Sequence, residues 1–236
     1  MGRAFECRRR AKEARWDKMS KVFPRLARSI TVAAKEGGPD PEANAKLRLA
    51  INNAKAQNMP KDNIEIAIKR ASGSDAADIT EITYDGKGPH GSLFVIECAT
   101  DNTNRSVTNL RTTFTKNGGQ LVQSGSLDFL FNRKAVVEFD ATDDLDLDEI
   151  QLSLIDAGLE EFEVEDGVVR AIAGYTSFND LNHGVEELGI TPTKAGLERI
   201  PTSPVELSDD QMAEVETLLD KIEEDDDVQQ VFTNIG

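Results

Sequence analysis

The chain has 236 residues, of which 39% are hydrophobic and only 6% aromatic, and its formal net charge is -16. The length suits two or three modules that each bury a core, and the few aromatic rings argue against recognition of single strands by base stacking. No apolar run approaches the roughly 18 residues that cross a bilayer, and no apolar segment follows the N-terminal basic cluster as in a signal peptide. We therefore expect a cytoplasmic protein without a membrane partner.

The charge is divided unevenly along the chain. Residues 1–70 hold 17 Lys or Arg and 8 Asp or Glu, a net of +9, so the remaining residues carry -25. The stretch CRRRAKEARWDKMSK (7–21) alone contains seven basic residues. Such asymmetry is typical of a polyanion-binding segment attached to modules with another task. The alternative is that the basic segment is a solvated face or docks on the protein's own acidic modules.

Residues 18–35 have the period of an amphipathic helix. One side is apolar from Met19 to Ala33, and the other carries a basic stripe of Lys18, Lys21, Arg25, Arg28 and Lys35. Pro24 fits best in the first turn of this helix, which we therefore expect to begin near Ser20. Segregation of charge from core favours an external partner, and nucleic acid is the polyanion that such a stripe suits.

Two shorter helices are predicted next. Gly37-Gly38 ends the first helix, and Asp40 is the expected N-cap of a second helix that has Pro41 in its first position and runs to about Gln57. Arg48 and Lys55 lie nearly in line on its polar side. The break at 58–60 precedes a third helix over about 61–72. These helices predict a small basic bundle that, with its N-terminal arm, covers residues 1–75.

The period changes to that of strands from residue 79. ITEITYDG and GSLFVIECATD predict two strands joined by the loop GKGPHG, followed by a helix over 103–117 and a strand at SGSLDFLF (124–131). Residues 134–203 have the order β-α-β-β-α-β of a ferredoxin-like domain. A last helix and strand lie within 204–236. Because residues 76–133 lack a final helix and strand, we expect the C-terminal segment to supply them.

The sequence thus predicts an α+β protein. It has an N-terminal three-helix domain and two ferredoxin-like α/β domains, of which one (134–203) is inserted in the other (76–133 and 204–236).

Motifs for catalysis or metal binding fail on inspection. The three glycines of GKGPHG (86–91) match G-x-G-x-x-G. They lie between two predicted strands and open no helix, so a hairpin loop is the better interpretation. Asp144, Asp146 and Asp148 lack the rest of a calcium loop and instead favour the start of the following helix. The two histidines, His90 and His183, have no legible nucleophile nearby. We expect no enzyme activity, cofactor or metal, and two distant cysteines exclude a disulfide framework.

A polar stretch, Asp101 to Arg105, lies where a predicted strand ends and a helix begins. Asp101 or Thr103 is expected to cap the helix, and Arg105 is the residue we expect to contact phosphate there.

Five segments carry a resemblance to a known family. They are EGGPDPEANAKLR (36–48), NAKAQNMPKDNIEIAIKRASG (53–73), ITYDGKGPHG (82–91), ECATDNTNRSV (97–107) and NGGQLVQSGSLDFLF (117–131). In these the chain resembles the YebC/PmpR family, which includes the mitochondrial translational activator of cytochrome c oxidase. The resemblance implies the same arrangement of a helical domain and two α/β domains. The first twenty residues depart from the family's usual start, although they stay basic.

The resemblance implies two roles, both of which need a polyphosphate partner. Some members are described as DNA-binding transcriptional regulators, and this is the function we expect; others are ribosome-associated factors that help translation through proline runs, which is the alternative. A third interpretation is an acidic protein-interaction scaffold. The expected partner is duplex DNA or ribosomal RNA, and under the alternative the partner is the ribosome. The residues expected to bind it are Arg8, Arg9, Arg10, Lys12, Arg15, Lys18, Lys21, Arg25, Arg28, Lys35, Arg48, Lys55 and Arg105.

Overall fold

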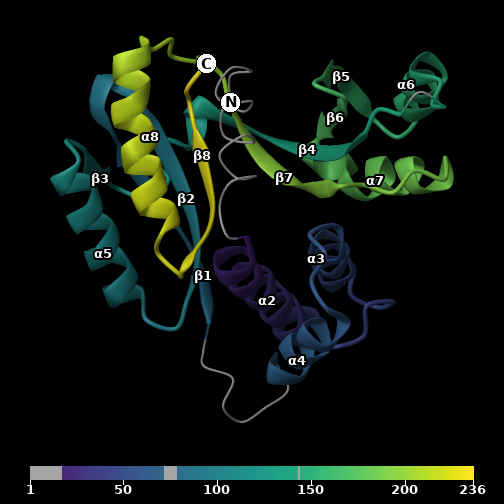
Figure 1. The fold of residues 1–236 in the computed structure, drawn as a ribbon, viewed down its shortest axis with the longest axis horizontal. Coiled ribbons are helices and arrows are strands. Elements are labelled where there is room, and N and C mark those ends of the chain that lie inside the picture. The colour runs from purple at the N-terminus through teal and green to yellow at the C-terminus, as the bar shows by residue number, and fades with distance from the viewer. Residues whose placement is uncertain (1–17, 72–78, 143) are drawn as a thin grey trace. The chain divides into compact units, whose positions relative to one another are not determined.

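The computed structural model describes residues 18–71, 79–142 and 144–236. These residues form seven helices and two four-stranded antiparallel sheets, so the predicted α+β class is confirmed (Figure 1). The helices are α2 (Lys18–Gly37), α3 (Ala45–Ala56), α4 (Lys61–Ala71), α5 (Thr103–Lys116), α6 (Leu147–Ile155), α7 (Phe178–Glu187) and α8 (Asp209–Glu223). The strands are β1 (Thr80–Lys87), β2 (Leu93–Thr100), β3 (Gln120–Val122), β4 (Phe131–Asp140), β5 (Leu159–Glu165), β6 (Val168–Gly174), β7 (Lys194–Pro201) and β8 (Val228–Thr233).

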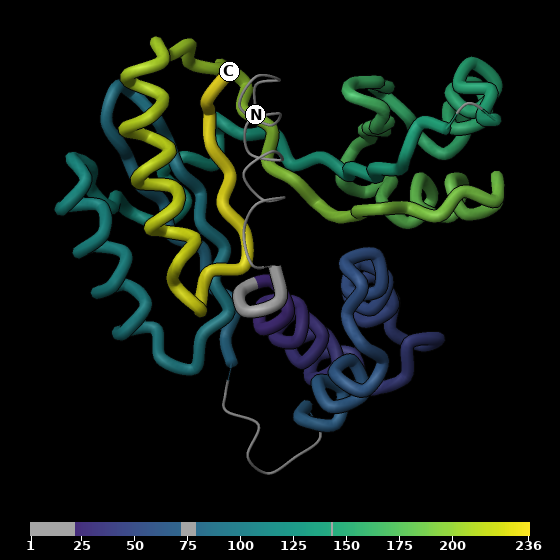
Figure 2. The backbone as a smooth tube through the Cα atoms, viewed as in Figure 1, coloured from purple at the N-terminus to yellow at the C-terminus, as the bar shows by residue number. Residues whose placement is uncertain are grey.

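The first sheet has the order β3-β1-β2-β8, so the strand nearest the C-terminus completes a sheet that begins at residue 80. Figure 2 shows β8, in yellow, beside the blue-green strands of this sheet. The helix α5 connects β2 to β3, and β1 lies between those two strands. The strands are arranged in space as in a ferredoxin-like sheet. The difference lies in chain order: β1, which lies between the two strands that α5 connects, is the first strand of the module instead of the third.

The core of this module lies between the sheet and the helices α5 and α8. Phe94 on β2 meets Phe114 on α5 edge to face, with ring centroids 5.5 Å apart, and Leu218 of α8 joins the same cluster. Gly86 of β1 lies directly beneath the Phe114 ring, and an added Cβ there would come within 2.3 Å of it. Because β1 and β2 pair as a hairpin around residues 88–92, the interpretation of GKGPHG as a hairpin loop is confirmed.

The second sheet has the order β5-β6-β4-β7 and is built from one continuous stretch of chain. The element order β4-α6-β5-β6-α7-β7 and this strand order together are those of a ferredoxin-like domain. Helices α6 and α7 bury Leu154 and Leu181 respectively. Asp146 caps α6 through the backbone N–H of Glu149, in agreement with the predicted role of the acidic residues before this helix.

Two predicted helix starts differ from the structure. Asn44, and not Asp40, caps the second helix: its side chain accepts from Leu47 N at 3.0 Å and donates to Ala33 O and Gly38 O. The amide therefore ties the cap to the end of α2, which a local pattern does not reveal. Pro24 lies inside α2, whose described part begins at Lys18, because packing of α2 against α4 and the sheet outweighs the local cost of proline.

The predicted strand SGSLDFLF is also wrong. Residues 120–122 form the short strand β3 instead, and the chain then turns until β4 begins at Phe131. Leu127 and Phe131 pack on Val95 and Phe232 across the face of the sheet opposite α5 and α8. The buried carboxylate of Asp85 accepts the Leu127 N–H at 2.9 Å, so this backbone bonds to a side chain instead of to a neighbouring strand.

The described residues form two compact units. The first comprises 18–50, 60–71, 79–132 and 200–236, and the second 51–59 with 133–142 and 144–199. The helices α2 and α4 fall in the same unit as the first sheet, because α2 packs on β2 and β8 as well as on α4. In the second unit, the Asn53 side chain pairs with the backbone N–H and C=O of Ala195 on β7. Within the described ranges, no helix is both long and apolar enough to span a membrane.

Candidate nucleic-acid interface

Seven of the predicted binding residues belong to the N-terminal basic segment. Five lie outside the residues that the structure describes: Arg8, Arg9, Arg10, Lys12 and Arg15. Lys18 and Lys21 belong to α2, but only their backbone is described. For these seven, contact with nucleic acid stays a prediction from the sequence.

The next two cations of the stripe face the protein itself. The Arg28 guanidinium donates to Asp227 Oδ1 at 2.6 Å and to Ala99 O at 2.8 Å. Arg25 donates to the backbone carbonyl of Glu223, at the end of α8. Ser29, the residue after Arg28, donates to Gln229 Oε1 at 3.1 Å. This part of α2 therefore docks on the first α/β module, which is the internal contact that the sequence left open as an alternative.

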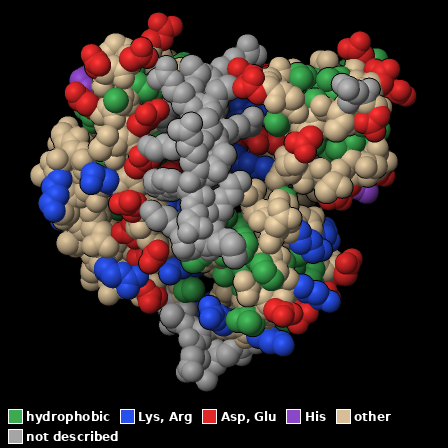
Figure 3. Space-filling view, viewed as in Figure 1, with side chains coloured by type: hydrophobic (Ala, Val, Ile, Leu, Met, Phe, Trp, Pro, Cys, Tyr) green, Lys and Arg blue, Asp and Glu red, His purple; other side chains and the backbone are tan. Residues whose placement is uncertain are grey.

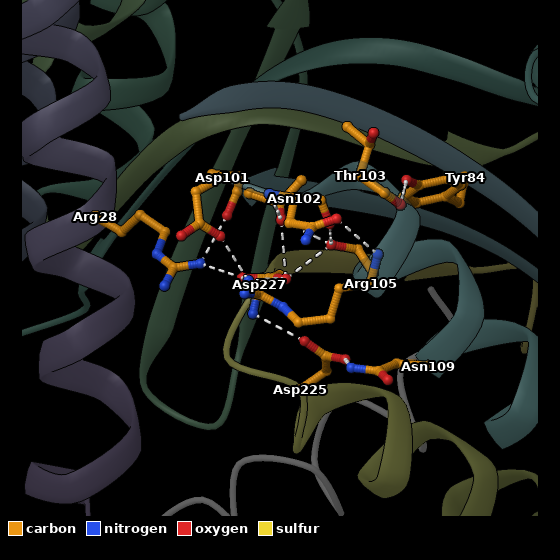
Figure 4. A network of polar contacts seen from close by, with 12 residues as sticks. Arg28, Tyr84, Asp101, Asn102, Thr103, Arg105, Asn109, Asp225 and Asp227 are labelled. Carbon is orange, nitrogen blue, oxygen red and sulfur yellow. Dashed lines mark hydrogen bonds and ion pairs between the residues drawn. The ribbon is translucent and has the colours of Figure 1, made fainter. Parts of the chain in front are cut away.

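Asp227 lies at the centre of this docking site (Figure 4). It precedes β8, its residue is only 2% exposed, and it accepts hydrogen bonds from both sides. Arg105 Nη2 donates to both of its oxygens, at 2.8 and 2.9 Å, opposite Arg28. The hydroxyls of Ser106 and Thr100 donate to Oδ2 at 2.7 and 2.9 Å. A single carboxylate thus joins α2, β2, α5 and the start of β8.

This carboxylate is ionised over the whole physiological range. Burial alone would raise the pKa of Asp227, but the hydrogen bonds from Arg105, Ser106, Arg28 and Thr100 outweigh burial and lower the pKa to about 2. These donors compensate the buried charge of Asp227. Removal of one charged partner would leave the remaining charge buried without compensation, which is destabilising.

Arg105 is positioned by the first turn of its own helix. Asn102, and not Asp101 or Thr103 as expected, caps α5 by accepting the Arg105 N–H at 3.0 Å. Asp101 instead accepts from Arg105 Nη2 at 2.7 Å. With Asp101 on one side and Asp227 on the other, the Arg105 side chain is still 46% exposed. It is therefore reachable from solvent, but its charge is already balanced within the protein.

The remaining predicted residues lie on the surface of the helical segment. Lys35 is exposed in the last turn of α2, and Arg48 and Lys55 are exposed on α3. Arg48 makes only long hydrogen bonds, of 3.3 and 3.5 Å, to the carbonyls of Pro41 and Glu42. Arg48 and Lys55 are therefore accessible to a partner, whereas Arg28 is engaged by Asp227.

Sequence reasoning missed Asp227 altogether. It ends the acidic run from Glu223 to Asp227, which the sequence presents as a solvated helix end. Its neighbour Asp226 is exposed, and no local pattern separates the two. Within the described ranges, no group of three or more His, Cys, Asp or Glu side chains is arranged to hold a metal ion.

The fold defines a class of α+β protein in which helices precede two ferredoxin-like modules, the second inserted in the first. Comparison with known families agrees with this class. Residues 3–74 match the family described as "TACO1/YebC protein N-terminal domain", and residues 79–235 match "TACO1/YebC second and third domain". The chain belongs to the TACO1/YebC family, which confirms the resemblance seen in its motifs.

Similar proteins cover the chain from end to end. Proteins of Wolinella succinogenes and Campylobacter curvus, each named a probable transcriptional regulatory protein, are 59% and 58% identical over the full length of both chains. The crystal structure of a conserved hypothetical protein from Aquifex aeolicus has 36% identity and a TM-score of 0.84, and the match covers 93% of this chain and 91% of that one.

Proposed function

We propose that this protein is a nucleic-acid-binding regulator of gene expression, and more specifically a DNA-binding transcriptional regulator. The observation that carries the proposal is the division of charge, with a net of +9 in residues 1–70 of a chain whose total is -16. The names of the relatives from Wolinella succinogenes and Campylobacter curvus support the regulatory role. The proposed activity is binding without a catalytic step.

The mechanism is electrostatic anchoring by the basic segment. Cations that neutralise phosphates release counterions, so affinity falls steeply as salt rises and carries no base specificity by itself. Arg25 and Arg28 contribute indirectly, because their contacts with Glu223 and Asp227 hold α2 on the first α/β module. The contacts with phosphate are then assigned to the arm, Arg8 to Lys21, and to the exposed Lys35, Arg48 and Lys55.

A ribosome-associated role is the second candidate. The observation that favours it is the charge of -25 after residue 70, which suits a neighbourhood of basic ribosomal proteins while the basic segment binds ribosomal RNA. The two candidates share the anchoring mechanism and differ in the target.

One experiment separates them. Wild type is compared with a variant in which Arg8, Arg9 and Arg10 are changed to Glu, and with a control in which Lys87, Arg133 and Lys221 are changed to Glu. The control makes the same change in charge at exposed positions outside the arm. Each protein is tested for a salt-dependent shift of duplex DNA and for sedimentation of cell lysate through sucrose.

We expect wild type and the control to bind duplex DNA and the arm variant to lose this binding. We also expect wild type to stay at the top of the gradient. Co-migration of wild type with ribosomes that only the arm variant loses would replace the DNA proposal by the translational one. Absence of both, or equal loss in the control, would contradict anchoring by the arm.

A further inference from the structure

Helix α5 is chemically unlike the acidic module to which it belongs. Its sequence, TNRSVTNLRTTFTK, has three cations, five threonines and no Asp or Glu, although the chain holds 43 acidic residues. The helix α8, which packs beside it on the same face of the sheet, has six acidic residues and one lysine among 15. Figure 3 shows blue Lys and Arg side chains on the left of the view, where α5 lies in Figure 1.

The composition of α5 is not required by its packing. Ser106, Leu110 and Phe114 are buried and supply the inward face of the helix. Two exposed residues, Arg105 and Asn109, are bonded to acidic side chains. The other exposed residues are Thr103, Asn104, Thr108, Arg111, Thr112, Thr115 and Lys116. These positions tolerate any polar side chain on structural grounds, so the absence of carboxylates among them calls for a chemical reason.

Two of the cations on this face have no counter-charge among the described residues. Arg105 is balanced by Asp101 and Asp227, whereas the side chains of Arg111 and Lys116 have no ion-pair or hydrogen-bond partner among the residues that the structure describes. The field of this face is therefore positive, beside a helix whose field is negative.

The side chains between the cations are short and neutral. The hydroxyls of Thr108 and Thr112 donate to the backbone carbonyls four residues before them, at 2.7 and 2.8 Å, and so lie close to the helix. A partner backbone can thus approach the helix closely, but these two hydroxyls have already used their protons and do not donate to its phosphates. The contacts with phosphate on this face therefore come from the cations.

We propose that the exposed face of α5 is a second contact site for the phosphodiester backbone of nucleic acid, separate from the N-terminal basic segment. This inference rests on the proposed nucleic-acid-binding function and extends it to the first α/β module. The helix is about 21 Å long at 1.5 Å per residue, which equals the axial rise of about six nucleotides of one strand. Arg111 and Lys116 are five residues apart, about 7.5 Å along the axis and about 140° around it, so they bind phosphates at the two edges of the exposed face. The acidic α8 bounds the contact on one side by repulsion.

The test uses the full chain with Arg111→Gln and Lys116→Gln together. Glutamine is a good helix former, so α5 is retained. The matched control is Arg133→Gln with Lys221→Gln, which removes the same charge from two exposed residues that also lack partners among the described residues. Binding of a duplex DNA and of an RNA hairpin is measured by anisotropy over about 50 to 200 mM salt, the range in which counterion release dominates.

The α5 variant is expected to bind about tenfold more weakly than wild type at the low-salt end. The slope of log K against log salt is expected to fall by about 1.8 on duplex DNA, which is 0.9 for each lost phosphate contact. A merely structural role for the two residues would leave this slope unchanged. Loss on one probe alone identifies whether DNA or RNA lies on this face.

Two outcomes would overturn the inference, and they are distinguishable. If wild type binds and the α5 variant keeps the affinity and slope of the control, α5 is not a contact site, although the proposed function stands. If wild type binds neither probe, the proposed function fails and the α5 site with it.

Discussion

Replacement of Asp227 by asparagine tests whether one carboxylate holds α2 to the first α/β module. The side chain keeps its size, but it loses the charge that faces Arg28 and Arg105, and an amide NH2 replaces one of its oxygens. Because Arg, Ser and Thr donors converge on this group, that NH2 meets donors instead of acceptors. The variant is therefore expected to weaken both the ion pairs and the hydrogen bonds that Asp227 makes.

The magnitude follows from the pKa of Asp227. A pKa lowered from 3.8 to about 2 corresponds to about 2.4 kcal/mol in favour of the charged form, since one pKa unit is worth 1.36 kcal/mol. Water around the partly exposed arginines screens part of this, which leaves about 1 to 2 kcal/mol. We expect Asp227→Asn to lower the free energy of unfolding of the first unit by about that amount at pH 7.

The sign of the pH dependence gives a second readout. The pKa of Asp227 is depressed in the folded protein, so its contribution is fully present above about pH 4 and is lost as the pH falls toward 2. Urea unfolding of wild type and variant, followed at pH 7 and at pH 3, should therefore show a difference that shrinks at the lower pH. Hydrogen exchange of α2 amides should quicken in the variant at pH 7, since α2 loses its anchor.

Asp226→Asn is the matched control, because it is the same change at an exposed neighbour. Exposed substitutions of this kind usually alter stability by less than about 0.5 kcal/mol. The reasoning would be refuted if the two variants cost the same, or if the cost of Asp227→Asn were equal at pH 7 and pH 3.

Two further predictions concern the cores of the two units. Gly86→Ala should destabilise the first unit by about 1 to 3 kcal/mol, because a Cβ would lie 2.3 Å from the Phe114 ring. The control is Gly196→Ala, since a Cβ there would lie within 4 Å of no described residue except its chain neighbours. Equal urea midpoints for the two variants would contradict the close contact. Glu198 is 5% exposed, and although burial alone would raise its pKa, Lys194 and Arg170 lower the pKa to about 2. Glu198→Gln should therefore cost the second unit about 2 to 3 kcal/mol at pH 7, a difference that wild type loses as the pH falls from about 4.5 toward 2. The exposed Glu161→Gln should change little, and a pH-independent cost of Glu198→Gln would point to packing alone.

Much of the fold follows from local patterns in the sequence. The change of period at residue 79 and the β-α-β-β-α-β order of the inserted module are visible because helices and strands repeat their apolar residues with different spacings. The assignment of the last helix and strand to the first sheet also followed from the sequence, because that module otherwise lacks two elements. The division of charge is a property of composition, which needs no structure.

Errors in these predictions arose where a distant residue decides the local structure. The segment 124–131 alternates like a strand, but Asp85 takes the Leu127 N–H and the cluster around Val95 holds the chain in turns. Asp40 has the features of a cap, yet Asn44 also reaches the end of α2 and therefore begins the helix. Local propensity is a matter of a kilocalorie per mole or less, so a tertiary contact of similar size reverses it.

The pairing of charged side chains also could not be predicted from the sequence. From the sequence, Arg25, Arg28 and Lys35 belong to one stripe, and Asp227 is one of five consecutive acidic residues. Only the tertiary structure buries Asp227 between Arg28 and Arg105 and leaves Arg111 and Lys116 without a counter-charge among the described residues. The number and order of charges are fixed by the sequence, whereas the pairing of Arg28 with Asp227 joins segments 199 residues apart that meet only in the folded chain.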